Sequence, residues 1–155
     1  MINDPTDMVQ LVKFLPSRPR GKACIVLTHE YECQKDWAAE LARQTDSGHI
    51  HLLTMFTEDK SLGNQIGQFQ VPELFEFLKG RSEQPVLVVS GMEFLKATWT
   101  AMPKNIEEFA SRIKTWDQSP CLLFAMQYGK ILVNYDFGRR YTYTFVIDQR
   151  ETLAL

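Results

Sequence analysis

The chain has 155 residues, of which 45% are hydrophobic and 23% charged, a composition that excludes collagen-like, coiled-coil and disordered proteins. Its 17 basic and 19 acidic residues leave a formal net charge of -2, so binding to nucleic acid or to a membrane surface would need a local cluster of charge. The three cysteines form no C-x-x-C pair, which argues against a disulfide framework or a zinc knuckle. The first ten residues carry acids where a secretory signal carries bases, so we predict a cytoplasmic protein without a membrane segment.

The first half of the chain is expected to alternate between helices and strands. The run ACIVL, for example, is apolar at every position, which predicts a strand buried on both faces. In chain order we predict a helix over 7–15, a strand over 23–27, a helix over 36–44 that Ser47 and Gly48 end, a strand over 49–56, and a polar loop over 58–69 that serves as a partner-binding surface.

The second half repeats the alternation. We predict a helix over 72–79 that Gly80 closes, a strand over 85–90, a helix over 105–116, a strand over 121–127, and two looser segments over 130–137 and 141–148. The last two segments would form either a hairpin or one edge strand and one central strand. Because right-handed crossovers place helices on both faces of a parallel sheet, the predicted fold is a three-layer α/β domain. We expect one domain over residues 1–155, with a mostly parallel sheet and a C-terminal strand pair.

The residues that follow the first strand are the first place to look for a ligand site, because ligands bind beyond the carboxyl ends of strands in open α/β sheets. A phosphate-binding loop has the order strand, G-x-x-x-x-G-K-[ST], helix, in which the glycines let backbone N–H groups surround the phosphates. Aligned on Lys35, this chain has His29 and Gln34 at the glycine positions and Asp36 at the position of the Mg²⁺-binding hydroxyl. The length of the loop fits, but its residue types disfavour a triphosphate.

The strand over 85–90 departs from the ATPase pattern as well. In ATPases with a phosphate-binding loop, a strand of this kind ends in Asp, which holds Mg²⁺ and positions the attacking water. Here the strand ends in Ser90-Gly91, and the first carboxylate after it is Glu93. We therefore predict no cofactor and no enzymatic activity; if ATP and Mg²⁺ were bound, Lys35 and Glu93 would hold them. The plainer roles are a solvated lysine at a helix start for Lys35 and a helix-start or loop acid for Glu93.

The order of these elements resembles the core of small P-loop NTPase-like proteins, through VLVVSGMEFL over 86–95, CLLFAMQYG over 121–129 and FGRRY over 137–141. In particular, the chain resembles the small P-loop subunit of BREX-type phage-defence systems. Those proteins have a strand that ends in an acid followed by x-x-Glu-apolar-Leu, comparable to 90–95, and a late Tyr-Arg-Arg-Tyr-like element, comparable to 138–141. The resemblance implies a RecA/AAA-like core that works with larger ATPase, methyltransferase or DNA-binding partners. The departures at both nucleotide motifs favour a scaffold or adaptor role.

Two basic segments are candidates for contact with DNA or with a partner. Aromatic side chains beside basic ones are used to stack bases and to contact phosphates. The alternative is a solvated edge hairpin with cross-strand tyrosines, and in an NTPase-like assembly an exposed arginine can also act on a neighbour's nucleotide. The residues concerned are Arg18, Arg20 and Lys22 in the first segment and Lys130, Arg139, Arg140 and Tyr141 in the second.

Two further groups of residues have side chains suited to metal binding or catalysis. His29, Cys33, His49 and His51 are residue types that zinc accepts, but His29 follows the first strand whereas His49 and His51 begin the second. We therefore place them at opposite ends of a parallel sheet and predict no metal site. Cys33 with His29 as its base has the residue types for covalent catalysis, although no third group that would orient the histidine is identifiable.

The sequence thus predicts a non-catalytic accessory or adaptor subunit with a degenerate P-loop NTPase-like core. Its partners would be larger protein subunits, in an assembly that acts in DNA-related phage defence, with possible contact to DNA and none to a membrane. Two alternatives stay open. One is a divergent ATPase that uses Lys35 and Glu93, and the other is a nucleic-acid-binding module that uses the basic, tyrosine-rich C-terminal segment.

Overall fold

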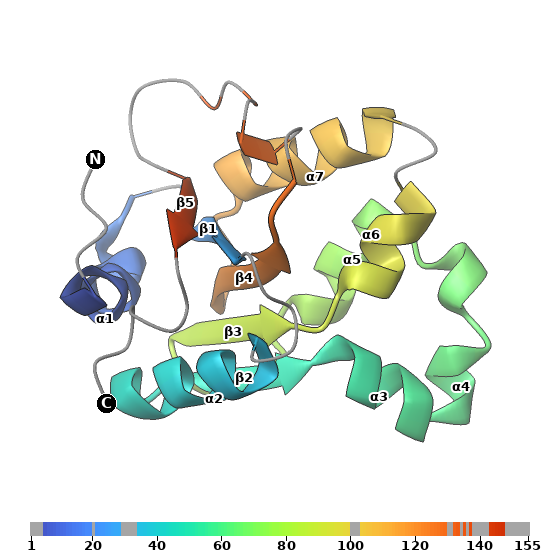
Figure 1. Cartoon of the computed structure of the whole chain (residues 1–155), viewed down its shortest axis with the longest axis horizontal. Helices are drawn as coiled ribbons and strands as arrows, with labels where there is room; N and C mark the ends of the chain where they lie inside the picture. The colour runs from blue at the N-terminus through green and yellow to red at the C-terminus, as the bar shows by residue number, and fades with distance from the viewer. Residues whose placement is uncertain are drawn as a thin grey trace.

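The computed structural model describes residues 5–19, 21–28, 34–99, 103–129, 132, 133, 135, 137 and 143–147. Its centre is an all-parallel, five-stranded sheet with the strand order β2-β3-β4-β1-β5 (Figure 1). The strands are β1 (Ala23–Thr28), β2 (Gly48–His51), β3 (Val86–Ser90), β4 (Cys121–Gln127) and β5 (Thr144–Ile147). The helices are α1 (Pro5–Phe14), η1 (Leu15–Ser17), α2 (Gln34–Thr45), α3 (Leu52–Glu58), α4 (Lys60–Gly63), η2 (Ile66–Gln68), α5 (Val71–Leu78), α6 (Glu93–Trp99) and α7 (Pro103–Thr115).

The side chains of the central strands alternate between two apolar layers. On β1, Cys24 and Val26 pack with the buried residues of α1 and α2, whereas Ile25 and Leu27 pack with those of α5, α6 and α7. A strand that is covered on both faces has to be apolar at every position, which explains the unbroken run ACIVL. The predicted three-layer α/β fold is therefore present.

The connection that follows β1 runs in the opposite direction to the later ones. From β1 the chain passes through α2 and beyond β4 and β3 to reach β2, and from there it returns through β3 and β4 to β5. Because crossovers are right-handed, this reversal places α2 on one face of the sheet and α5, α6 and α7 on the other. Ligands of such sheets bind outside the carboxyl ends of the strands where the direction reverses. The expected ligand site is therefore at the carboxyl end of β1.

Most of the predicted elements are present with bounds that differ by two residues at most. They include the strands expected over 23–27, 85–90 and 121–127 and the helices expected over 7–15, 36–44, 72–79 and 105–116. Gly80 follows α5 with a φ of +68°, as expected of a residue that closes a helix. None of the helices in the described ranges combines the length and the apolar character that a membrane span requires.

The strand predicted over 49–56 was wrong after its third residue. β2 ends at His51, and α3 begins at Leu52. Leu52 and Phe56 are buried and four residues apart, so they lie on one face of a helix that packs on the core. A short apolar run does not distinguish a strand from a helix by itself, and here the helical spacing decided the outcome.

The preceding helix ends within one residue of its predicted end, but the role predicted for Gly48 there was wrong. Gly48 does not end α2; it is the first residue of β2, and the left-handed position after the helix belongs to Asp46, with a φ of 54°. Gly48 instead permits a close approach, since a Cβ there would lie 2.5 Å from the hydroxyl oxygen of Ser82.

The segment over 58–69 is not a plain loop, because it contains α4 and η2. Asp59 caps α4 by accepting the N–H groups of Ser61 and Leu62 at 2.9 and 3.3 Å. Phe69 is buried and packs edge-on against Phe56 of α3, with ring centroids 5.0 Å apart. Part of the segment predicted as a partner-binding loop is therefore built into the core.

The predicted C-terminal strand pair is corrected in part. Residues 144–147 form β5, which runs parallel to β1, its neighbour among the described strands. Leu132 and Val133, which were expected in a strand, are helical. The other residues of 130–142, apart from Tyr135 and Phe137, lie outside the described ranges.

Candidate functional site

Three polar side chains are fully buried among the described residues, if aromatic residues and cysteines are set aside. Thr28 ends β1, Ser90 ends β3, and Gln34 begins α2, so all three lie at the carboxyl edge of the sheet. A buried polar group that has no hydrogen-bond partner costs several kcal/mol, so such a cluster has to satisfy itself.

Gln34 provides the central link of this polar network. Its Nε2 donates to Oγ1 of Thr28 at 3.4 Å, and its Oε1 accepts the backbone N–H of Gly91 at 3.1 Å. Thr28 in turn donates to the carbonyl oxygen of Met126 on β4 at 3.3 Å. The amide of Gln34 therefore joins the ends of β1 and β3 and occupies the position between them.

Two histidines extend the network to β2. Nε2 of His49 and Nδ1 of His51 lie 2.9 and 2.8 Å from the same atom, Oγ of Ser90. A serine hydroxyl has one proton, so one ring nitrogen accepts from Ser90 and the other donates to it. Burial, His51 and Lys35 lower the pKa of His49 to about 4, and burial and Lys35 also lower the pKa of His51. Both rings are therefore neutral near pH 7.

Gly91 is fixed in place by the same contacts. Its φ is +70°, a conformation that glycine adopts without strain, and a Cβ there would lie 2.4 Å from Cε1 of His51. The imidazole of His51 thus packs directly on the backbone that follows β3. The carboxyl end of β3 is thus surrounded by the two imidazoles of β2.

Lys35 is at the start of α2, as predicted, and its ammonium lies beside α3. Nζ donates to Oγ1 of Thr54 at 3.2 Å. Because its charge lowers the pKa of both histidines, the ammonium lies near the β2 end of the network. Lys35 and Glu93, the two residues predicted to hold a nucleotide, thus have partners on different elements.

Glu93 is the first residue of α6 and interacts with the end of β4. Its Oε2 accepts the backbone N–H of Gln127 at 2.6 Å, and Lys96 donates to the carbonyl oxygen of Gln127 at 2.9 Å. Nζ of Lys96 also lies 3.6 Å from Oε1 of Glu93. The pair therefore binds both polar backbone groups of Gln127 and fixes β4 to α6.

One premise for separating the histidines was wrong, because β2 does not continue to residue 56. β2 ends at His51, which pairs with Ser90, so His51 lies at the carboxyl edge, where β1 also ends at Thr28. His29 and Cys33 lie outside the described ranges. Within those ranges, no three His, Cys, Asp or Glu side chains are grouped so that they could hold a metal ion.

One residue of the first predicted basic segment, Arg18, lies against an aromatic ring at the amino edge of the sheet. The guanidinium carbon of Arg18 lies 5.5 Å from the ring centroid of Tyr143, the residue before β5. Nη1 of Arg18 also donates to the carbonyl oxygen of Gly21 at 3.2 Å, next to the start of β1. Lys22, also in the first segment, is half-buried just before β1. The other predicted contact residues lie outside the described ranges: Arg20, Lys130, Arg139, Arg140 and Tyr141.

The polar network itself was not predicted from the sequence. Gln34 was noted only as a residue in place of a glycine, and Ser90 as one in place of an acid. One signal was present in the sequence, since His49 and His51 are two residues apart and therefore share a face of a strand. The chain matches no protein-family model, no curated protein and no solved structure.

Proposed function

We propose that this chain is a non-catalytic accessory or adaptor subunit of a multiprotein assembly, with a degenerate P-loop NTPase-like core. The assignment of that assembly to DNA-related phage defence rests on the sequence resemblance alone. A subunit of this kind contributes a folded surface to larger partners and does not turn over nucleotide itself.

The observation that carries the proposal is the place of Gln34. In a phosphate-binding loop the corresponding residue is a glycine, whose backbone comes close to the phosphates. Here the amide side chain of Gln34 is fully buried and bonded both to Thr28 on β1 and to Gly91 after β3. A phosphate placed there would have to displace that buried amide and break both of its hydrogen bonds, which supports the loss of nucleotide binding.

Calorimetric titration with Mg-ATP tests the nucleotide half of the proposal. We expect no binding at millimolar nucleotide by the wild-type chain, and no turnover. The Lys35→Ala variant is the control, because it removes the lysine that aligns with the lysine of a phosphate-binding loop. Micromolar binding that Lys35→Ala abolishes would contradict the proposal, and turnover that Glu93→Gln removes while binding survives would favour the divergent ATPase.

The adaptor part of the proposal predicts that the chain forms a complex of fixed composition with its partners. The tagged chain, expressed at its natural level, is expected to elute with larger subunits at a mass that multi-angle light scattering assigns to one stoichiometry. If the chain purified from these cells elutes only at its own mass of 18.0 kDa, the adaptor function is contradicted.

Nucleic-acid binding at the amino edge is a second candidate, and the position of Arg18 over the ring of Tyr143 favours it, since it places a cation beside an aromatic side chain. Such a module would bind DNA with an affinity that falls steeply with salt, and the Arg139→Ala/Arg140→Ala double variant would lose that binding. Absence of binding to single-stranded and double-stranded DNA at low salt would exclude it.

A further inference from the structure

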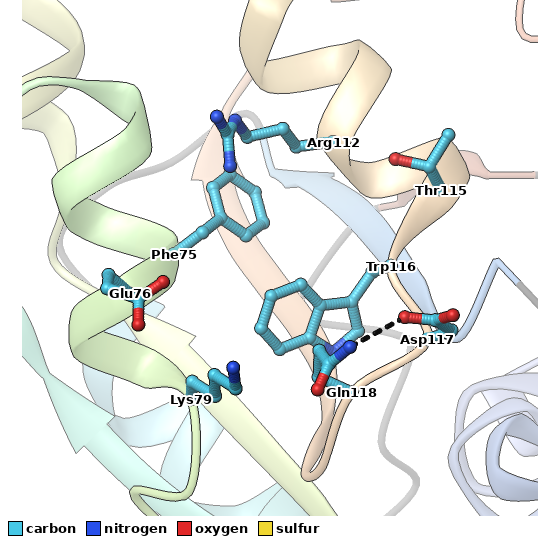
Figure 2. Close-up of a pocket in the computed structure, with 8 residues that line it drawn as sticks. All are labelled: Phe75, Glu76, Lys79, Arg112, Thr115, Trp116, Asp117 and Gln118. Atoms are coloured by element: carbon cyan, nitrogen blue, oxygen red, sulfur yellow. Dashed lines mark hydrogen bonds between the residues drawn. The ribbon is translucent and has the colours of Figure 1, made fainter.

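A hollow lies between α5 and α7, at the amino edge of the sheet. The carboxyl ends of both helices lead into β3 and β4, so the hollow is on the opposite edge from the polar network. Its volume is about 260 Å³, and it opens to solvent. Phe75 of α5 and Trp116, which follows α7, form its apolar floor, with ring centroids 5.5 Å apart (Figure 2).

Backbone contacts fix the walls of the hollow. The N–H of Gly80 donates to the carbonyl oxygen of Ser119 at 2.8 Å, which ties the end of α5 to the segment after α7. The N–H of Lys22 donates to the carbonyl oxygen of Trp116 at 2.7 Å, and the indole Nε1 of Trp116 donates to Pro120 at 2.9 Å. The hollow is therefore formed before anything binds, which lowers the entropy lost on binding.

Charges of both signs surround the opening. Figure 2 shows Glu76 and Lys79 on the α5 side and Arg112 and Asp117 on the other side. Glu76 and Lys79 make no ion pair with any described residue. Two acids and two bases give the rim no net charge, so a nucleic acid or another polyanion would meet two carboxylates as well as two cations.

The size of the hollow indicates what fits inside it. Pockets that enclose a whole small ligand usually have volumes of roughly 300–1,000 Å³, and this one is smaller and more open. It suits one large side chain over an aromatic floor, with polar groups around it. Interfaces between proteins are commonly built in this way, with an aromatic anchor in a pocket and a charged rim.

We propose that the hollow receives one aromatic side chain of a partner polypeptide, whose neighbouring residues include one acid and one base. The acid would lie against Lys79, because Arg112 is already paired with Glu108, whose Oε2 lies 3.3 Å from its Nε. The base would lie against Glu76 or Asp117. This inference rests on the adaptor function proposed above and gives it a docking point between α5 and α7.

The test uses the whole chain and a capped peptide that contains one tryptophan between an aspartate and a lysine. Nuclear magnetic resonance follows the indole N–H signals of the protein. Trp116 is in the hollow, whereas Trp37 and Trp99 are buried in α2 and α6 and serve as internal controls. We expect a saturable shift of the Trp116 signal only, and none with the peptide in which alanine replaces tryptophan.

Two protein variants and one matched control complete the test. Thr115→Phe fills the hollow and Lys79→Glu reverses one rim charge, and each is expected to weaken peptide binding about tenfold or more. Ser111→Phe adds the same ring to an exposed position of the same helix, outside the hollow, and should bind as the wild type does. Equal binding by Thr115→Phe, equal binding of the alanine peptide, or displacement of the peptide by an oligonucleotide would overturn the inference.

The failure of this inference and that of the proposed function give different results. If Thr115→Phe still elutes with the same larger subunits as the wild type, the docking point is elsewhere, and the adaptor function stands. If the chain binds and hydrolyses Mg-ATP, the non-catalytic function fails, while the peptide titration, which contains no nucleotide, is unaffected.

Discussion

The two edges of the sheet use their polar side chains in opposite ways. At the carboxyl edge, the polar network of Thr28, Gln34, Ser90, His49 and His51 is buried or half-buried, and its members bond to one another. At the amino edge, the charges around the hollow are exposed or half-exposed, and those of α5 have no partner among the described residues. The usual ligand edge of the fold is thus satisfied internally, and the opposite edge retains groups that are available for binding. Variants should therefore change stability at the first edge and binding at the second.

The largest effect is expected for Gly91→Ala. Alanine at this position would have to adopt a positive φ, and its Cβ would meet the ring of His51. We therefore expect a loss of about 3 kcal/mol in the free energy of unfolding. Gly80→Ala is the matched control, because its φ of +68° is similar but no atom lies within 4 Å of the added Cβ. It should lose only about 1 kcal/mol. Urea denaturation measures both, and equal losses would show that the contact with His51 is unimportant.

Gln34→Ala should be the next most damaging change. It removes the acceptor of the buried Gly91 N–H and the amide that donates to the hydroxyl of Thr28, which predicts a loss of about 2 kcal/mol. Gln10→Ala, at an exposed position of α1, is the control and should change stability by less than about 0.5 kcal/mol. A neutral Gln34→Ala variant would mean that the network does not hold β1 and β3 together.

Glu93→Gln is expected to lose about 1 kcal/mol and to have no other consequence. The amide keeps an oxygen for the N–H of Gln127 but loses the charge that faces Lys96. Glu107→Gln, on the exposed side of α7, should be neutral in the same denaturation experiment. If Glu93→Gln were as stable as the wild type, the contacts of Glu93 with Gln127 and Lys96 would contribute nothing to stability, and Glu93 would be free for another role.

The histidines predict a dependence of stability on pH. In the unfolded chain His49 titrates near pH 6.5, but its pKa in the folded protein is lowered to about 4. The unfolded state therefore binds more protons between these two values, so stability is complete above pH 6.5 and falls as the pH decreases toward 4. Because the ring is partly exposed, we expect about 1 kcal/mol over this range. A His49→Gln variant should show a smaller loss between pH 7 and 5 than the wild type, and identical slopes would rule out this contribution.

The smallest stability effects are expected at the hollow. Lys79→Glu and Asp117→Lys change exposed charges that make no ion pair with described residues, so each should alter the free energy of unfolding by less than about 0.5 kcal/mol. The same denaturation curves measure them. A loss comparable to that of Gln34→Ala at either position would remove the difference between the two edges.

Much of the fold was predictable because burial leaves a strong pattern in the sequence. The run ACIVL could only be a doubly covered strand, and Pro72 and Gly80 marked the two ends of α5 through their backbone preferences. The segment LLTMF was not predictable in the same way. Its Leu52, Met55 and Phe56 fit a helix, but a short apolar run also fits a strand, and only packing on the core decides between the two.

The candidate site was less predictable than the fold, because its bonds join residues that are far apart in the sequence. Ser90 meets His49 and His51 only because β2 pairs with β3 in a register that places His51 opposite Ser90. Gln34 reaches Gly91 because α2 begins beside the end of β3. The hollow depends on the carboxyl ends of α5 and α7 lying side by side, which no local pattern specifies.

The place of β1 in the sheet has a consequence for the synthesis of this chain. β1 spans residues 23–28, but its two neighbours are β4 at 121–127 and β5 at 144–147. A ribosome that adds about 5–20 residues per second needs roughly 5–20 s to progress from β1 to β4. During that time an apolar strand has no partner from its own chain. In that interval ACIVL can be covered only by segments that are already made, such as α1 and α2, or by another protein.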